Sequence, residues 1–532
     1  MTGNSFLSRD HIVAGARFNR WLVPPAALAI HLSIGMAYGF SVFWLPMTHL
    51  IAHADPALCA GQGFGAELVS KTCNWTVPAV TSVFEIFIAV LGLSAALWGG
   101  WLERAGPRKA GLIAALCWGG GLVLLGISVS LHQLWLVYLA AVICGIGQGL
   151  GYITPVSTLI NWFPDRRGLA TGLAIMGYGG GAMIGAPLAV WLMARFSANG
   201  IPGVAPALIA LGVIYFIFMA GGALGFRVAP ERWQPAGWTP PATEATNAMI
   251  TPANVLVDTA WRTPQFWLIW GVLCLNVTAG IGVISMASPM LQDVFGAKLV
   301  GVDTATALTA GQKAAIVAAA AGLVGLISLF NALGRIFWAS LSDKIGRKTM
   351  YYAIFVIGIV VYGLLPTWGH LGLPSLFVLS ICVILSMYGG GFSTVPAYLA
   401  DIFGTQMVGA IHGRLITAWS VAGVIGPALI AGLRQFQLDH GVAHNLVYDI
   451  TLYVMAFLLF CGLVCNYFVK PVDAKYHASH LETQGGKDRG LAGTQSVARG
   501  GFGLVGVLAW LAVGVPFLVG LSIACTKVAA LV

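Results

Sequence analysis

Long apolar segments recur along the whole chain and limit the folds that it can adopt. Hydrophobic residues make up 58% of the sequence and charged residues only 8%, whereas a soluble globular domain carries about 25% charged residues. A bilayer core of ~30 Å is crossed by a helix of roughly 20 apolar residues, and backbone that faces lipid has to be helical or closed into a barrel. The sequence therefore predicts an all-α membrane protein.

We predict twelve spans and one additional apolar helix. The twelve spans lie near residues 22–46, 77–100, 111–130, 135–159, 169–193, 204–226, 266–290, 314–338, 350–366, 373–398, 412–433 and 447–469, and the additional run covers 503–525. Polar stretches then divide the chain into a first half (1–226), a linker (227–265), a second half (266–469), a tether (470–501) and a C-terminal helix (502–532).

Two similar loop motifs indicate that the halves are related. The first is Gly99-x3-Glu103-Arg104-x-Gly106-x-Arg108-Lys109, the second is Ala339-x3-Asp343-Lys344-x-Gly346-Arg347-Lys348, and each follows the second span of its half. An acidic side chain can hold the positive N-terminal end of a neighbouring helix, and the making and breaking of such contacts gives a two-state element. The acidic and basic residues that we expect to take part in gating are Glu103, Arg104, Asp343 and Arg347.

The positive charges predict the orientation. With a cytoplasmic N-terminus, 20 of the 27 Lys and Arg residues fall on the cytoplasmic side, six fall outside and one, Arg335, lies within a span. Cytoplasmic loops are typically rich in Lys and Arg, so we expect a cytoplasmic N-terminus and a bacterial inner (plasma) membrane. The net charge of +9 then reflects topology and attraction to anionic lipid rather than a nucleic-acid partner. No metal spacing or cofactor motif is present, and a disulfide between Cys59 and Cys73 of the first outer loop stays an open alternative.

Several further segments resemble one transporter family. They are Gly35-Met-Ala-Tyr38-Gly-Phe40 in the first span, the block Asn161-Trp-Phe-Pro-Asp-Arg-Arg-Gly168 after the fourth span, and Asn331-Ala-Leu-Gly-Arg335 in the eighth. Together with the duplicated motifs, they resemble the oxalate/formate antiporter family of the major facilitator superfamily, which is related to the monocarboxylate transporters. The resemblance implies a twelve-helix, two-half carrier for small carboxylate anions, with a thirteenth helix added here, and a co- or counter-transported proton or anion.

Arg335 is a candidate anion site even without the family. A charged residue inside a span costs about 2.5–3.5 kcal/mol at a helix centre and usually marks a transport pathway. Ala95 occupies the corresponding position of the first half, so the duplicated scaffold itself does not require a charge. A guanidinium stays ionised and can bind a carboxylate through two parallel hydrogen bonds. The structural alternative is a side chain that extends to the interface.

Two other ionisable residues lie within spans. Glu85 in the second span could carry a proton, because burial raises the pKa of a carboxyl group, or could contact a gate. His31 in the first span is a weaker candidate, because a lone histidine there usually hydrogen-bonds to a neighbouring helix.

Aromatic residues recur where the family lines its cavity, and their rings and hydroxyl groups could enclose a small anion. The alternative for each one is ordinary helix packing. These candidate substrate-binding residues are Tyr38, Tyr152, Tyr178, Tyr388, Phe392 and Trp419.

Two departures from the family bear on substrate and coupling. The oxalate-transporting member has a Lys in its eleventh span, where Trp419 aligns here, and a dianion facing a single buried cation would keep an uncompensated charge. We therefore expect a monocarboxylate such as formate, lactate or pyruvate. The proton-coupled relatives have an Asp four residues before the span-eight Arg, where Asn331 stands here, so exchange is slightly favoured over proton symport through Glu85.

Other function classes fit less well. A membrane enzyme would need clustered His, Cys or acidic residues, and a receptor would not need duplicated halves. Among carriers, a sugar transporter is the main alternative, but sugar sites favour several amides and acids, and the candidates are only Gln148, Asn276, Asn331 and Glu85.

Overall fold

The computed structural model describes residues 6–15, 17–51, 63–198, 201, 203–230, 233–235, 237–238, 249–251, 253–302, 309–478 and 503–528. Within these residues the secondary structure is helical apart from two isolated bridges, Val13 with Val228 and Ala198 with Ile201. The predicted all-α class is confirmed. Parts of the predicted linker and tether lie outside the described residues, and the predicted domain boundaries stay predictions.

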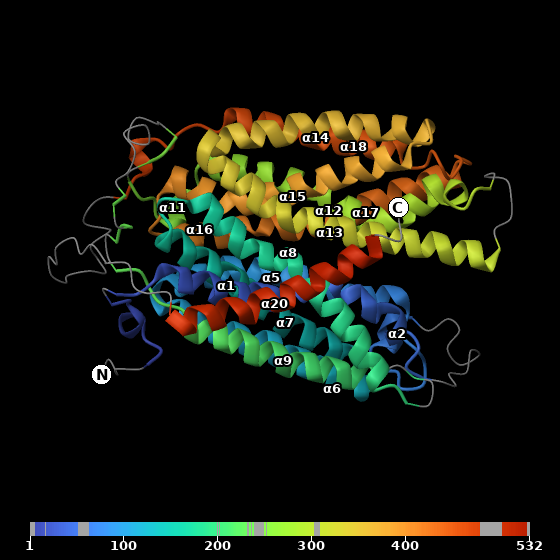
Figure 1. The fold of residues 1–532 in the computed structure, drawn as a ribbon, viewed down its shortest axis with the longest axis horizontal. Coiled ribbons are helices and arrows are strands. Elements are labelled where there is room, and N and C mark those ends of the chain that lie inside the picture. Colours follow the sequence, from blue (N-terminus) through green and yellow to red (C-terminus); the bar gives the residue numbers. More distant parts are fainter. Residues whose placement is uncertain are drawn as a thin grey trace.

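The first group of long helices forms one side of the bundle (Figure 1). Its helices pack mainly on one another, with the closest association among α5, α6, α7 and α9. The group consists of α1 (Val23–Ile34), α5 (Val77–Ala105), α6 (Pro107–Ser130), α7 (Leu134–Trp162), α8 (Arg167–Arg195) and α9 (Val204–Gly225).

The second group lies beside the first and is made of the helices after the linker (Figure 1). Its members are α12 (Pro264–Leu299), α13 (Ala310–Ile345), α14 (Arg347–His370), α15 (Pro374–Phe403), α16 (Val408–Leu415), α17 (Thr417–Asp439) and α18 (Asp449–Phe468). The two groups meet where α8 packs on α13 and α15, and where α5 packs on α16 and α17. A site on these helices is therefore shared by both groups.

Twelve described segments are long and apolar enough to cross a membrane, and they include the C-terminal helix α20 (Gly503–Val528). Eleven of the twelve predicted spans correspond to such segments. The predicted eighth span corresponds to α13, a 36-residue helix that packs between α8 and α15.

Two predicted spans are not continuous α-helices. The first passes from α1 into a 3₁₀ helix, η3 (Gly35–Phe43), and then into α2 (Trp44–Met47). A Cβ atom on Gly35 would lie 2.3 Å from the carbonyl oxygen of Tyr178, so the glycine allows η3 to approach α8 closely. The eleventh span is divided at Ile416, where α16 ends and α17 begins.

The helix α20 crosses the front of the bundle over the seam between the two groups (Figure 1). It packs against α1 and α8 of the first group and against α13 of the second. The indole Nε1 of Trp510 donates a hydrogen bond of 3.0 Å to the carbonyl oxygen of Trp21. The additional apolar run is thus a helix associated with both groups.

One end of the bundle carries most of the polar connections, and we call it the linker side. The N-terminal segment pairs there with the start of the linker, because the amide of Ala14 donates to the carbonyl of Val228 at 3.0 Å. A cavity of about 760 Å³ on this side is lined by residues from the N-terminal segment, the linker and the loops after α5, α7 and α15. At the opposite end, Cys73 is disulfide-bonded, whereas Cys59 lies outside the described residues.

Close helix contacts at glycines generate a first prediction. A Cβ atom on Gly334 of α13 would lie 2.2 Å from the carbonyl oxygen of Ser386 in α15, whereas one on Gly363 of α14 would meet nothing within 4 Å. Overpacking a close contact costs about 1–3 kcal/mol. We expect Gly334→Ala to lower the melting temperature of the purified protein, measured by tryptophan fluorescence in detergent, and Gly363→Ala to leave it unchanged or raised. Equal melting temperatures would contradict the observed packing of α13 on α15.

Candidate functional site

The buried guanidinium of Arg335 joins the two groups of helices. Its Nε donates to the Oδ1 of Asn331 one turn earlier on α13, at 3.0 Å. Its Nη1 donates to the carbonyl oxygen of Ile175 on α8, also at 3.0 Å. Its Nη2 has no hydrogen-bond partner within the described part of the chain. Because Arg335 is fully buried, it does not extend to the interface, and the N–H groups of its Nη2 stay available for an acceptor.

Glycines on two helices make room for this side chain. A Cβ atom on Gly179 of α8 would lie 3.0 Å from the Nε of Arg335, and one on Gly389 of α15 would lie 2.4 Å from the carbonyl oxygen of Asn331. Both glycines follow a tyrosine, Tyr178 or Tyr388, directly in sequence. Arg335 is therefore packed closely between α8 and α15. In each of these two helices a tyrosine directly precedes the glycine that makes room for it.

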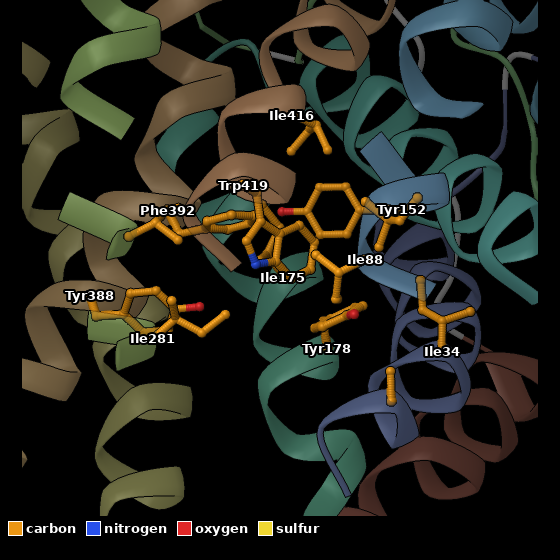
Figure 2. Close-up of a cluster of buried hydrophobic side chains, with 14 of the residues drawn as sticks. Ile34, Ile88, Tyr152, Ile175, Tyr178, Ile281, Tyr388, Phe392, Ile416 and Trp419 are labelled. Atoms are coloured by element: carbon orange, nitrogen blue, oxygen red, sulfur yellow. The ribbon is translucent and has the colours of Figure 1, made fainter. Parts of the chain in front are cut away.

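Trp419 on α17 stands at the centre of a buried aromatic cluster (Figure 2). We call it the aromatic cage; it consists of Tyr38, Tyr152, Tyr178, Phe392 and Trp419. The centroid of the Trp419 ring lies 4.8 Å from that of Phe392, 5.2 Å from that of Tyr178 and 5.5 Å from that of Tyr152. The guanidinium carbon of Arg335 lies 5.5 Å from the ring of Phe392, so the cage and the arginine form one cluster.

The sixth predicted aromatic residue, Tyr388, closes this cluster across the seam. Its hydroxyl lies 3.0 Å from the hydroxyl of Tyr38 on η3, and Figure 2 shows Tyr388 and Tyr152 on opposite sides of the cage. Arg335 is close enough to interact electrostatically with the hydroxyls of all four tyrosines, Tyr38, Tyr152, Tyr178 and Tyr388. The structure thus brings together the seven residues that the sequence predicts for substrate binding.

The cage contains buried donors that the rest of the described chain does not satisfy. The hydroxyl of Tyr178 donates to the Oε1 of Gln148 at 3.2 Å. The hydroxyl of Tyr152, the indole Nε1 of Trp419 and the Nη2 of Arg335 are buried and make no hydrogen bond of standard geometry there, and the hydroxyl of Tyr38 is near enough to interact with both Trp419 and Arg335. A buried donor left unsatisfied costs about 1–3 kcal/mol. A ligand with several acceptor oxygens and a negative charge would satisfy all three groups.

Two buried histidines border the cage on the linker side. His31 on α1 packs against Tyr152 with ring centroids 5.2 Å apart, and His412 on α16 packs against the same tyrosine at 5.8 Å. Both nitrogens of His412 are buried without a partner among the described residues. His412 was not predicted from the sequence, because it stands at the very start of the predicted eleventh span, 412–433, in no distinguishing local motif.

The acidic residues of the duplicated motifs bind helix N-termini across the seam, as the sequence predicts. The carboxylate of Asp343 accepts hydrogen bonds of 2.9 Å from the amides of Gly168 and Leu169 at the start of α8. Glu103 accepts a bond of 3.1 Å from the amide of Gly409 at the start of α16. In each case the acid of one group holds the positive end of a helix dipole in the other group.

Among the described residues, ion pairs within 4 Å reinforce the contact of Asp343, whereas Glu103 interacts with Arg9 only at longer range. Arg347 pairs with Asp343 at 2.7 Å and with Asp401 at 3.1 Å, and Asp401 also pairs with Arg167 of the first group at 3.0 Å. Pro107 occupies the place of Arg347 in the first motif, so Glu103 lacks such a partner at that position. These contacts close the linker side between the groups. Arg167 and Asp401 were not predicted as functional residues from the sequence.

Two predicted residues lie apart from these clusters. Glu85 is exposed on the protein surface of α5, and it interacts electrostatically with Tyr138 of the first group. Arg104 is exposed at the end of the same helix. Their predicted coupling and gating roles stay predictions.

Comparison with known proteins places the chain among membrane carriers. The model of the Major Facilitator Superfamily matches residues 27–427 and 313–529. The chain is 28% identical over 373 residues to the oxalate:formate antiporter of Oxalobacter formigenes, which covers 69% of this chain and 79% of that protein. It is 26% identical over 383 residues to apicoplast pyruvate carrier 1 of Toxoplasma gondii, over 62% of this chain and 64% of the carrier.

A solved structure agrees with the fold. The crystal structure of the Major Facilitator Superfamily transporter FucP in the outward conformation matches with a TM-score of 0.55 at 10% identity. The match covers 85% of this chain and all of that one. The likeness confirms the predicted twelve-helix carrier architecture.

The contacts on the linker side generate a second prediction. Removing a charge-assisted hydrogen bond costs about 1.5–3 kcal/mol, so Asp343→Asn should weaken the closed arrangement. A cysteine in place of the buried Thr154 on α7 should then react roughly tenfold faster, or more, with a polar maleimide. The matched control is Asp165→Asn, which removes a pair with Arg20 inside the first group at 2.6 Å and should leave the labelling rate unchanged. Unchanged labelling in Asp343→Asn would show that this contact does not hold the linker side closed.

Proposed function

This chain belongs to the Major Facilitator Superfamily, and on that premise we propose that it carries small carboxylate anions across a membrane by alternating access. The observation that carries the proposal is the unpartnered Nη2 of the buried Arg335, beside the unpartnered donors of Tyr152 and Trp419. In this superfamily, substrate sites lie near the bilayer midplane between the repeats. Arg335, about 12 Å along α13 from Asp343 at 1.5 Å per residue, is at a suitable depth.

The chemistry of the cage supports a carboxylate in particular. The free Nη2 of Arg335 carries two N–H groups of a cationic side chain, and charge-assisted hydrogen bonds to a carboxylate are roughly twice as strong as neutral ones. The two relatives are named for oxalate and formate and for pyruvate, which are all small carboxylates. A sugar site would need several acceptors as well as donors, whereas the Nη2 of Arg335 and the indole Nε1 of Trp419 can only donate.

We further propose a preference for monocarboxylates such as formate, lactate or pyruvate. Among the described residues, Arg335 is the one Lys or Arg that interacts electrostatically with the four tyrosines, and the centre of the cage is the neutral Trp419. One fixed cation balances one carboxylate. The second candidate is oxalate/formate exchange, which the 28% identity with the oxalate:formate antiporter favours and which the tyrosine and tryptophan donors could support.

The closed linker side supports an assignment of gating roles. Asp343, Arg347 and Glu103 would release the starts of α8 and α16 when the linker side opens, and the two groups would then rock about the site. We propose that the linker side faces the cytoplasm of a bacterial inner membrane, because the excess of Lys and Arg lies in the segments on that side.

Arg335 provides the direct test of this function. In proteoliposomes loaded with unlabelled formate, lactate, pyruvate or oxalate, the unmodified protein should exchange at least one of them for labelled external anion. Arg335→Gln should abolish this counterflow because the charge is gone, and Arg335→Lys should also abolish it because a compact ammonium cannot reproduce the planar guanidinium that contacts Asn331 and Ile175 and still presents a free nitrogen. Both variants should insert and elute as folded protein. Counterflow at the unmodified rate in Arg335→Gln would disprove the proposed anion site.

Trp419 provides a test of selectivity. The unmodified protein should exchange monocarboxylates and reject oxalate, because a second carboxylate charge would remain uncompensated in a site of low dielectric constant. Trp419→Lys should gain saturable oxalate binding, and Trp419→Gln is the control for the change in shape and polarity without charge. Saturable oxalate uptake by the unmodified protein would instead favour oxalate/formate exchange.

A further inference from the structure

We propose that His31 is a proton-binding site and that its proton is carried together with the carboxylate. The inference rests on the proposed function, because it assigns the coupling ion to the same site. Its basis is the position of the imidazole relative to two backbone carbonyls and to Arg335.

Both nitrogens of His31 face hydrogen-bond acceptors. The Nδ1 lies 2.6 Å from the carbonyl oxygen of Ala174 on α8, and the Nε2 lies 3.1 Å from the carbonyl oxygen of Tyr152 on α7. A neutral imidazole has one N–H donor and one lone pair, whereas an imidazolium donates from both nitrogens. Carbonyl oxygens only accept, so the neutral ring can satisfy one of the two contacts. The protonated ring satisfies both.

The backbone of α8 also connects His31 with the anion site. Ala174, which contacts His31, is followed directly by Ile175, whose carbonyl accepts the hydrogen bond from Arg335. A Cβ atom on Gly177 would lie 3.0 Å from the Cβ of His31, so this glycine lets α1 approach the same turn of α8. The imidazole and the guanidinium therefore use neighbouring peptide groups of one helix.

The charges around His31 make its binding of a proton depend on the presence of the anion. The ionisable groups that interact with it are Arg335 from α13 and His412 from α16, and the ring of Tyr152 from α7 packs against it. None of the interacting groups is a carboxylate among the described residues. A buried charge is costly unless it is paired, so a second cation beside Arg335 needs negative charge from another source. A bound carboxylate supplies that charge.

Coupling follows from this dependence. If the anion increases the proton affinity of His31, the proton increases the affinity for the anion by the same factor. The loaded site then holds Arg335, one carboxylate and one proton, and the empty site holds neither ligand. Cotransport requires that the two ligands bind and leave together in this way. The route differs from the one expected through Glu85, whose side chain is exposed.

The test compares three variants with the unmodified full-length protein in proteoliposomes. The variants are His31→Gln, Glu85→Gln as the rival carrier, and His370→Gln as a matched histidine control, since His370 is exposed and pairs with Asp449 at 2.7 Å. The labelled anion is whichever of formate, lactate, pyruvate or oxalate the unmodified protein exchanges fastest. Two rates are measured, namely counterflow at equal pH and accumulation driven by an imposed pH gradient.

The proposal predicts gradient-driven accumulation in the unmodified protein and in the Glu85→Gln and His370→Gln variants. In His31→Gln this accumulation should be lost, while counterflow remains measurable because Arg335 still binds the anion. Accumulation that persists in His31→Gln, or that is absent from the unmodified protein, would overturn the inference and leave the proposed function intact. Absence of counterflow in the unmodified protein would overturn both.

A second measurement does not depend on the folding of any variant. The purified unmodified protein in weakly buffered detergent solution, with a pH indicator dye, should take up a proton when the same anion is added. Arg335→Gln should take up none because it does not bind the anion. Anion binding without proton uptake would contradict the assignment of His31.

Discussion

The structure depends on one guanidinium buried between two groups of helices. The guanidinium of Arg335 donates hydrogen bonds to two oxygens, one on Asn331 of its own helix and one on Ile175 across the seam. Neither acceptor carries a charge, so the positive charge stays uncompensated within the described part of the chain, at a depth where such a charge is expensive. A bound carboxylate would compensate this charge. It would also explain why the aromatic cage, the neighbouring glycines and the histidines gather around Arg335.

The contacts that surround this site divide into two kinds. At the linker side, charged contacts join the groups, with Asp343 and Glu103 holding helix N-termini and Arg347 bridging two aspartates. At the cage, the groups meet through aromatic rings and the paired hydroxyls of Tyr38 and Tyr388. A charged hydrogen bond is either formed or broken, which gives two distinct states. Packed aromatic rings can shift against one another and make room for a ligand. The first kind suits a gate, and the second suits a site that both groups line.

Much of this arrangement could be predicted from the sequence, because the membrane imposes helices on long apolar runs and a charge inside such a run is conspicuous. Arg335 was identified this way, the six aromatic residues were chosen from the resemblance to the transporter family, and the structure brings all seven together. His412, Arg167 and Asp401 were missed because their significance comes from partners on other helices. Glu85 was selected for its depth in a span, but the rotation of α5 leaves its side chain exposed. Depth follows from sequence position, whereas the direction of a side chain depends on packing.

The central claim is that Arg335 binds a carboxylate within the aromatic cage. The most direct measurement is an experimental structure of the protein with a carboxylate bound at saturating concentration. The account predicts the carboxylate within hydrogen-bond distance of the Nη2 of Arg335, with the hydroxyl of Tyr152 or the indole of Trp419 as a second donor. An anion bound elsewhere, with the Nη2 of Arg335 paired to a protein group, would contradict it.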